Sequence, residues 1–226
     1  MSNKVIKNDN GFSLIEILVA ITLVAVVFGI FASFSFNSAD DLEEASSNVE
    51  RAIRFSVDEA ALRNVIVRTR LYLDGSPQKI SVEYGPDDSF VIPISQTEAP
   101  SSSVLDQEAN DKKLKKFNRN FNRVPEFSDG AKPFKETVRV IAVGSSLTGL
   151  LYLDGQSSIY AYPTGEKDGG IIILGTNEEV RGITFEPFLL GFENINKYID
   201  PDIGLDDTAE EQDKIAMEMF ESWLKK

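Results

Sequence analysis

The stretch Gly11-Phe12-Ser13-Leu14-Ile15-Glu16, with the apolar run that follows it to about Phe36, decides how this chain is organised. No charged residue occurs between Ile17 and Ala39. Because an α-helix rises about 1.5 Å per residue, a helical run of this length spans a hydrocarbon core of roughly 30 Å. The run therefore predicts a membrane helix over residues 12–36.

Glu16 is the unusual residue of this run, because its carboxylate lies at the membrane end of the apolar helix rather than outside it. Inserting an unpaired ionised carboxylate into a bilayer costs about 2.5–3.5 kcal/mol on insertion scales. An opposite charge at about 4 Å is worth on the order of 4 kcal/mol at an effective dielectric near 20, before desolvation is subtracted. We therefore expect Glu16 to have a cationic partner.

The order of these residues resembles the class III signal of type IV pilins and type II secretion pseudopilins: a short basic leader, Gly11, Phe12, an apolar tract, and Glu16 at the fifth position after the glycine. The resemblance implies that a prepilin peptidase removes residues 1–11 and methylates the new amino terminus at Phe12. It also implies that Glu16 meets the freed amine of Phe12 on a neighbouring subunit, which sets the register of stacked subunits. A plain signal anchor with an incidental glutamate is the alternative.

Composition restricts the chemistry that the chain can perform. Its 226 residues, less a membrane helix, suffice for one soluble domain. Cys and His are both absent, which excludes disulfides, thiolate nucleophiles, imidazole bases and the usual zinc ligands. The formal net charge of −13 disfavours nucleic acid as a partner. No acidic cluster has the spacing of a calcium loop, so we predict no catalytic residue, metal, cofactor or small-molecule substrate.

The charges that flank the apolar run predict its orientation. Lys4 and Lys7 precede the run, whereas four carboxylates follow it within residues 40–44. The positive-inside bias therefore predicts a single-pass inner-membrane protein with a cytoplasmic N-terminus and a periplasmic C-terminal domain.

The helical pattern continues beyond the apolar run. From Leu42 to Ala61 apolar residues recur at helical spacing, with charged residues on the opposite side. We expect one continuous helix over residues 12–64, whose second half, residues 37–64, is amphipathic and periplasmic.

From Val65 the period changes to two, which predicts a β domain over residues 65–191. Asp74-Gly75 separates alternating segments at 65–73 and 80–84, as in a hairpin. The sequence Leu-Tyr-Leu-Asp-Gly occurs at 71–75 and again at 151–155. We interpret the two copies as two hairpins that use the same turn chemistry. The alternative is an internal duplication. Further short strands, expected at 90–94, 138–143, 159–162, 171–174 and 180–185, indicate antiparallel pairing.

The segment 160–165, Tyr-Ala-Tyr-Pro-Thr-Gly, is followed by apolar segments at 171–174 and 183–185. This region resembles the C-terminal region of the GspH/FimT group of minor pseudopilins and minor pilins. The resemblance implies an α+β, pilin-like fold, in which a long N-terminal helix packs on a β-sandwich-like domain of two antiparallel sheets.

Two polar regions interrupt this plan, and the first is a long loop expected over residues 95–133. It contains the one basic patch of the sequence, interleaved with Leu114, Phe117 and Phe121. Its cations are Lys112, Lys113, Lys115, Lys116, Arg119 and Arg123. It is either a solvated loop with a turn or two of helix, or a docking surface for an acidic neighbour or for anionic lipid headgroups.

The second polar region, residues 192–226, predicts an acidic linker over 194–207 followed by an amphipathic helix. Thr208 and Glu211 have the spacing of a capping box. Ile215, Met219 and Trp223 form one apolar ridge that must be covered. The helix either folds back on its own domain or docks in a groove of a partner subunit.

Together these resemblances imply a non-catalytic subunit: a minor pseudopilin of a type II protein secretion system. Its implied partners are other pseudopilins, the prepilin peptidase and the inner-membrane assembly platform. A minor type IV pilin that primes pilus assembly is the nearest alternative. A membrane-anchored periplasmic binding protein or enzyme is the alternative from another class.

Overall fold

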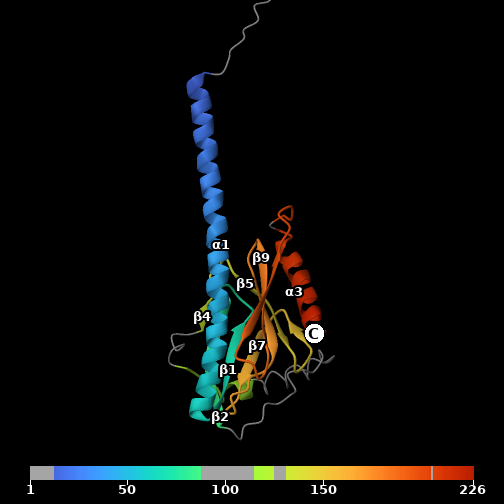
Figure 1. Cartoon of the computed structure of the whole chain (residues 1–226). Coiled ribbons are helices and arrows are strands. Elements are labelled where there is room, and N and C mark those ends of the chain that lie inside the picture. Colours follow the sequence, from blue (N-terminus) through green and yellow to red (C-terminus); the bar gives the residue numbers. More distant parts are fainter. Residues whose placement is uncertain (1–12, 88–114, 125–130, 205) are drawn as a thin grey trace, which may run out of the picture. The chain divides into compact units, whose positions relative to one another are not determined.

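The structure is a computed structural model that describes residues 13–87, 115–124, 131–204 and 206–226 (Figure 1). Over residues 29–37 the description covers the backbone and not the side chains. The chain divides into two compact units, residues 1–37 and 38–226. The expected leader at 1–11 and the expected strand at 90–94 lie outside the described residues.

Helix α1 spans Leu14–Arg63, in agreement with the predicted continuous helix. Within the second unit one stripe of this helix is buried, because its apolar residues recur every three or four positions. The buried residues are Leu42, Ala45, Val49, Ala52, Ile53, Val57 and Ala60. The helix ends at Arg63. Asn64 follows with a φ of 54°, a left-handed conformation that Asn tolerates better than most residues. The first strand begins at the next residue.

Two antiparallel sheets follow the helix, so the predicted α+β fold is confirmed. The first sheet has the order β3-β2-β1-β7, with β4 also paired to β2, and the second has the order β10-β9-β8-β5-β6. The first contains β1 Val65–Tyr72, β2 Lys79–Asp87, β3 Asn122–Arg123, β4 Lys132–Pro133 and β7 Gln156–Ala161. The second contains β5 Arg139–Ser145, β6 Leu151–Tyr152, β8 Gly170–Gly175, β9 Glu179–Phe185 and β10 Phe192–Tyr198.

Helix α1 and the inner faces of both sheets share one hydrophobic core. Val67 and Leu71 of β1 point into this core, as do Ile172 of β8 and Ile183 of β9, and all four contact the same buried cluster as Val49 of α1. Because successive residues of a strand point to opposite faces, the period of two in β1 assigns Val67 and Leu71 to one face. Strand β8 is apolar on both faces, so its inner face follows from the packing and not from the sequence pattern.

The two Leu-Tyr-Leu-Asp-Gly motifs have different roles. The first leads into the β1–β2 hairpin, as predicted. The second is not a hairpin, because β6 pairs with β5 in the second sheet whereas β7 pairs with β1 in the first. Residues 151–155 instead carry the chain from one sheet to the other. The motifs also touch: Gly155 N donates to Asp74 Oδ1 at 2.8 Å, and Leu73 N donates to Gly155 O at 2.9 Å.

The predicted linker over residues 194–207 is wrong in its first half, because β10 is an edge strand of the second sheet. Helix α3 then spans Thr208–Leu224. Its N-cap is Asp207 and makes no side-chain capping bond, so the predicted capping box at Thr208 is also wrong. The Thr208 hydroxyl donates instead to Gly204 O at 3.1 Å.

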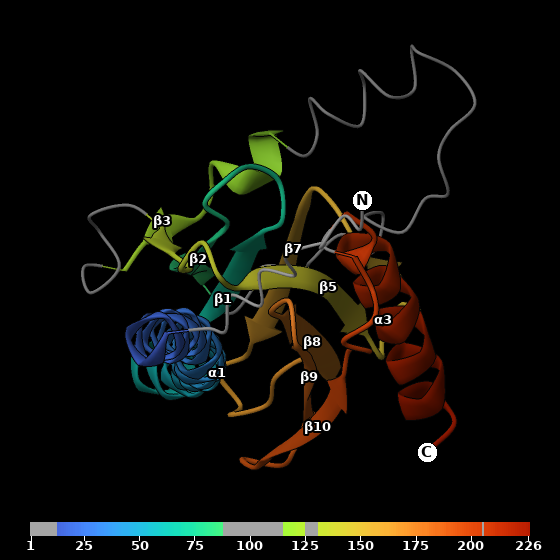
Figure 2. The ribbon, with the colours of Figure 1, turned by 90° about the horizontal axis from the view of Figure 1, so that it is seen from above.

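Helix α3 folds back on its own domain. Ile215, Met219 and Trp223 are 7%, 2% and 8% exposed and pack on the outer face of the second sheet. Figure 2 shows this sheet between α3 and α1. Gly144 of β5 permits the close contact, because a Cβ atom there would lie 2.5 Å from the Phe220 ring. The interpretation of this ridge as a docking site for a partner is therefore corrected: the chain covers it itself.

Asp168 closes the outer edge of β7, the last strand of the first sheet. Its Oδ2 accepts from Tyr160 N at 3.0 Å, and its own N–H donates to Tyr160 O at 2.8 Å. The Tyr162 hydroxyl donates to Asp168 Oδ1 at 2.9 Å. Burial raises the pKa of Asp168 above its ordinary value of 3.8, although these hydrogen bonds to the carboxylate oppose the shift.

This raised pKa predicts a pH-dependent difference between the wild-type protein and Asp168→Asn. Because folding favours the protonated carboxyl, the wild type gains stability relative to the variant as pH falls through the raised pKa, and the gain is complete near the unfolded value of about 3.9. Thermal unfolding of both proteins across this range measures the difference, and Asp154→Asn, at an exposed position, is the control. A difference that grows in the opposite direction contradicts the prediction.

Candidate assembly site

Apart from Glu16 and Thr22, residues 14–28 form a helical surface that is apolar on all sides. Every side chain in this stretch is exposed within the chain, from Leu14 at 83% to Phe28 at 72%. A helix that is hydrophobic on all sides is normally buried in protein or lipid. The covering of this segment must therefore come from outside the described chain.

Within the described part of the chain, no helix combines the length and the apolar character needed to cross a membrane. The predicted membrane segment, residues 12–36, includes Phe12 and the side chains of 29–36, which lie outside the described part.

Ser13 caps the first turn of α1 and so positions Glu16. The backbone N–H of Glu16 donates to Ser13 Oγ at 3.3 Å and to Ser13 O at 3.0 Å. Ser13 and Glu16 have the Ser-x-x-Glu spacing of a capping box, a signal present in the sequence that our sequence analysis did not use. A carboxylate in the first turn also interacts favourably with the positive end of the helix dipole.

The side chain of Glu16 is exposed, and no ion pair joins it to another described residue. The expected partner, the amine of Phe12 on another subunit, is not part of this single chain. Gly11 and Phe12, the expected processing site, lie outside the described residues.

Three of the four carboxylates that follow the apolar run, Asp41, Glu43 and Glu44, are engaged by their own domain. Lys135 Nζ donates to Asp41 Oδ1 at 2.5 Å, and Thr137 Oγ1 donates to Asp41 Oδ2 at 2.7 Å. These bonds hold the pKa of Asp41 below its ordinary value of 3.8, although burial opposes them. Lys135 also pairs with Glu44 at 2.8 Å.

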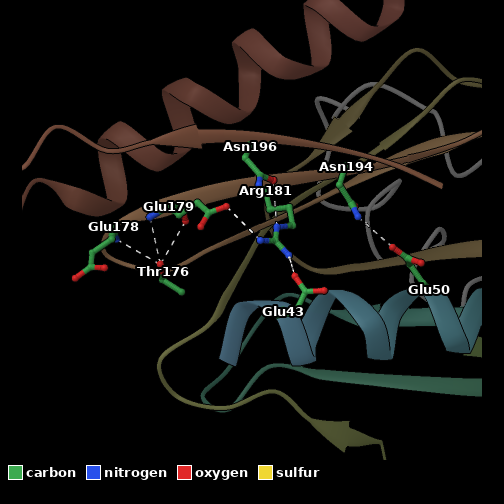
Figure 3. Close-up of polar contacts among 8 residues, drawn as sticks. All are labelled: Glu43, Glu50, Thr176, Glu178, Glu179, Arg181, Asn194 and Asn196. Carbon is green, nitrogen blue, oxygen red and sulfur yellow. Dashed lines mark hydrogen bonds and ion pairs between the residues drawn. The ribbon is translucent and has the colours of Figure 1, made fainter. Parts of the chain in front are cut away.

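Arg181 of β9 connects α1 to the second sheet (Figure 3). Its guanidinium donates to Glu43 of α1, to Glu179 at 3.3 Å and to Asn196 of β10 at 3.1 Å. About two turns after Glu43 on α1, Glu50 accepts a hydrogen bond from the side chain of Asn194 at 3.3 Å. The second half of α1 is therefore fixed to β9 and β10 by polar contacts as well as by the shared core.

The described part of the basic patch, residues 115–124, which we call the basic segment, is anchored on the outer face of the first sheet. Phe117 and Phe121 are buried there with Ile66 and Tyr160. Arg68 of β1, which is 1% exposed, lies under them with its guanidinium carbon 3.8 Å from the centre of the Phe121 ring.

The charge of Arg68 is compensated by Glu83 on the adjacent strand. Arg68 Nε donates to Glu83 Oε2 at 2.7 Å, and Arg68 Nη1 donates to Asn118 Oδ1 at 2.8 Å. The alternating sequence of β1 predicts that Arg68 lies on the outer face of the sheet. It does not predict that other residues cover this face and bury Arg68. The sequence did offer one sign of the ion pair: the register of the predicted hairpin sets Arg68 opposite Glu83.

This anchoring turns the cations of the segment outward. Residues 115–118 form the expected turn of helix, and the side chains of Lys115, Lys116, Arg119 and Arg123 are exposed. Lys112 and Lys113 lie outside the described residues. Docking at these lysines stays a prediction. Among the residues that the structure describes, no cluster of acidic side chains is arranged to hold a metal ion.

The capped apolar helix, the carboxylate in its first turn and the two-sheet domain that follows in the chain are consistent with a type IV pilin-like fold. A family model described as the prokaryotic N-terminal methylation motif matches residues 6–32. This match supports a type IV pilin-like protein, and the motif implies processing by a prepilin peptidase, anchoring by the N-terminal helix and assembly with other pilins. Searches of curated proteins and of solved structures found no match to the chain.

Proposed function

We propose that this chain is a minor pseudopilin of the GspH type, a non-catalytic structural subunit of the periplasmic filament of a type II protein secretion system. The observation that carries this proposal is the position of Glu16, on the capped first turn of an exposed apolar helix and five residues after Gly11. The matched methylation motif and the two-sheet domain support it. Growth of such a filament pushes folded substrates across the outer membrane.

In this role Glu16 recognises the neighbouring subunit during assembly. Cleavage after Gly11 creates an ammonium group on Phe12, and that group on one subunit pairs with Glu16 on the next. At about 4 Å such a pair is worth on the order of 4 kcal/mol at an effective dielectric near 20, before desolvation. The apolar residues 14–28 supply the packing around the pair, with the N-terminus on the cytoplasmic side of the inner membrane.

A minor type IV pilin that primes pilus assembly requires the same helix, cap and carboxylate. The two candidates differ in phenotype: loss of a pseudopilin stops enzyme secretion, whereas loss of a minor pilin stops the formation of surface pili. A tethered binding protein or enzyme, the candidate of another class, would keep its leader.

The basic segment is a second proposed contact, and its position favours an acidic protein over lipid. Arg123 pairs with β2 beside Tyr84, whose hydroxyl donates to Glu59 of α1. Glu59 follows Ser38 by 21 residues, which is about 32 Å of helix. At a Debye length of about 8 Å, headgroups at the end of the predicted membrane segment are screened from these cations. We infer that the segment contacts an acidic surface of a neighbouring subunit.

The first prediction concerns processing and is decided by mass spectrometry. The protein purified from membranes should begin at N-methylated Phe12. In cells without the prepilin peptidase it should retain residues 1–11. An intact leader in cells that carry an active peptidase contradicts the filament function and leaves a tethered β domain.

A second prediction concerns Glu16→Ala. The loss of the carboxylate should abolish co-purification with other pilin-like subunits, because the ammonium group of the neighbour then has no counter-charge. Thermal melting of the second unit should not change, since Glu16 lies outside it. Asp40→Ala, which removes an exposed carboxylate just after the apolar run, is the matched control. Unchanged association of the Glu16 variant removes this residue from its proposed role.

A third prediction tests the basic segment by reversing Lys115, Lys116 and Arg119 to Glu. Co-purification with neighbouring subunits should weaken by roughly tenfold, equivalent to about 1.4 kcal/mol. The control reverses three other exposed cations, Lys79, Lys214 and Lys225, and so changes the net charge equally. If both variants weaken co-purification equally, only the net charge matters and the proposed contact is wrong. If the variant binds anionic vesicles less tightly but still associates normally with other subunits, the segment binds lipid instead.

A further inference from the structure

The edges of the two sheets differ in how they are protected. The outer edge of β7 is closed by Asp168, while β3, β4 and β6 are two residues long. Short strands and blocked edges prevent pairing with other chains. Strand β10 has seven residues, and among the described residues nothing is paired along its outer side. It lies at the rim of the second sheet in Figure 2.

The backbone groups that β10 presents follow from its pairing with β9. Ile199 N donates to Glu178 O on the β9 side, and the β9–β10 register is continuous. Because alternate residues of a strand point their N–H and C=O groups to the same side, those of Ile195 face β9 and those of Asn194 and Asn196 face outward. Both asparagines are exposed. The edge is therefore ready to accept another strand.

The sequence of β10 indicates which strand fits. From Phe192 to Tyr198 it reads Phe-Glu-Asn-Ile-Asn-Lys-Tyr, which is complementary to itself when reversed about Ile195. In an antiparallel pair centred there, an aromatic residue faces an aromatic one, an acid faces a base and an amide faces an amide. The facing residues are Phe192 with Tyr198, Glu193 with Lys197, and Asn194 with Asn196.

We propose that β10 pairs antiparallel with β10 of a second copy of this chain, joining two five-stranded sheets into one continuous sheet. Each Asn194–Asn196 pair exchanges two backbone hydrogen bonds, and the two Ile195 residues form the close, non-hydrogen-bonded pair at the centre. Opposite charges directly across strands stabilise a sheet, whereas like charges destabilise it.

The side chains needed for this contact are accessible on both faces of the strand. On the α3 face, Glu193 and Lys197 are 79% and 42% exposed in their ion pairs with Lys226 and Glu218, so each can also meet a partner strand. On the α1 face, Tyr198 is 78% exposed. A second copy supplies Lys197 opposite Glu193, and Phe192 opposite Tyr198.

The pairing is an alternative to the filament and not part of it. Strand β10 runs alongside α1 in the opposite direction, since Phe192 lies by Arg54 at 5.0 Å and Arg181, bonded to Asn196, reaches Glu43. A two-fold β10 pair therefore sets the α1 segments of the two second units antiparallel. Subunits of one filament share one direction, and so do copies that a continuous α1 anchors in one membrane. The pair therefore forms between copies outside both arrangements, as in detergent micelles. This inference goes beyond the proposed function and does not depend on it.

Disulfide trapping tests the register directly, because the chain has no native cysteine. Full-length Ile195→Cys in detergent micelles should form a disulfide-linked dimer under mild oxidation, since Cα atoms in a non-hydrogen-bonded pair lie about 4.5 Å apart. Glu193→Cys is the matched control on the same face, and in this register its two copies lie too far apart to link. Equal or faster linking of Glu193→Cys overturns the proposed register.

A charge swap tests the partner. Glu193→Lys and Lys197→Glu should each weaken the dimer roughly tenfold, because each places like charges opposite one another twice. The double variant restores both pairs and should restore dimerisation, as measured by light scattering in the same micelles. Glu193 is exposed, whereas Lys197 is partly exposed and pairs with Glu218. Thermal melting of each variant is therefore measured alongside, so that a loss of fold is told apart from a loss of pairing. A wild-type chain that remains monomeric, or a double variant as weak as the single ones, overturns the proposal.

Discussion

The buried stripe of α1 is the contact on which the rest of the second unit depends. Leu42, Val49 and Ile53 belong to one buried cluster that includes residues from the inner faces of both sheets. Burying side chains of this size contributes about 1.5–3 kcal/mol each, as an upper estimate. The stripe cannot be exposed without also opening the space between the sheets. The same helix must therefore satisfy two environments, one apolar on all sides over residues 14–28 and one amphipathic beyond Ser38.

Periodicity in the sequence was sufficient wherever one face of an element meets this core. It predicted α1 to within two residues, together with β1 and β2, because their apolar residues recur at 3.6 or at 2. The sequence predicted β5, β8 and β9 from short apolar segments between turns. It failed for β10, where Asn194 and Asn196 read as a linker. That strand exists because β9 pairs with it, and pairing between segments leaves no local pattern in a polar edge.

Two other differences arose from tertiary contacts. The second Leu-Tyr-Leu-Asp-Gly motif has the turn chemistry of a hairpin, but its two flanking strands find partners in different sheets. Arg68 has the alternation of a solvent-facing residue, yet it is covered by Phe117 and Phe121 from about fifty positions later in the chain. At the candidate assembly site the sequence predicted Glu16, and its role stays a prediction because a single chain contains no partner for it.

The direct passage from α1 into β1 at Asn64 has a mechanical consequence. No flexible linker separates the two elements, and β1 lies between β2 and β7, hydrogen-bonded along both of its edges. Axial force on the helix therefore loads β1 in shear, so that many ladder hydrogen bonds share the load at the same time. A domain connected in this way transmits thrust from its helix as a rigid body and does not unravel strand by strand.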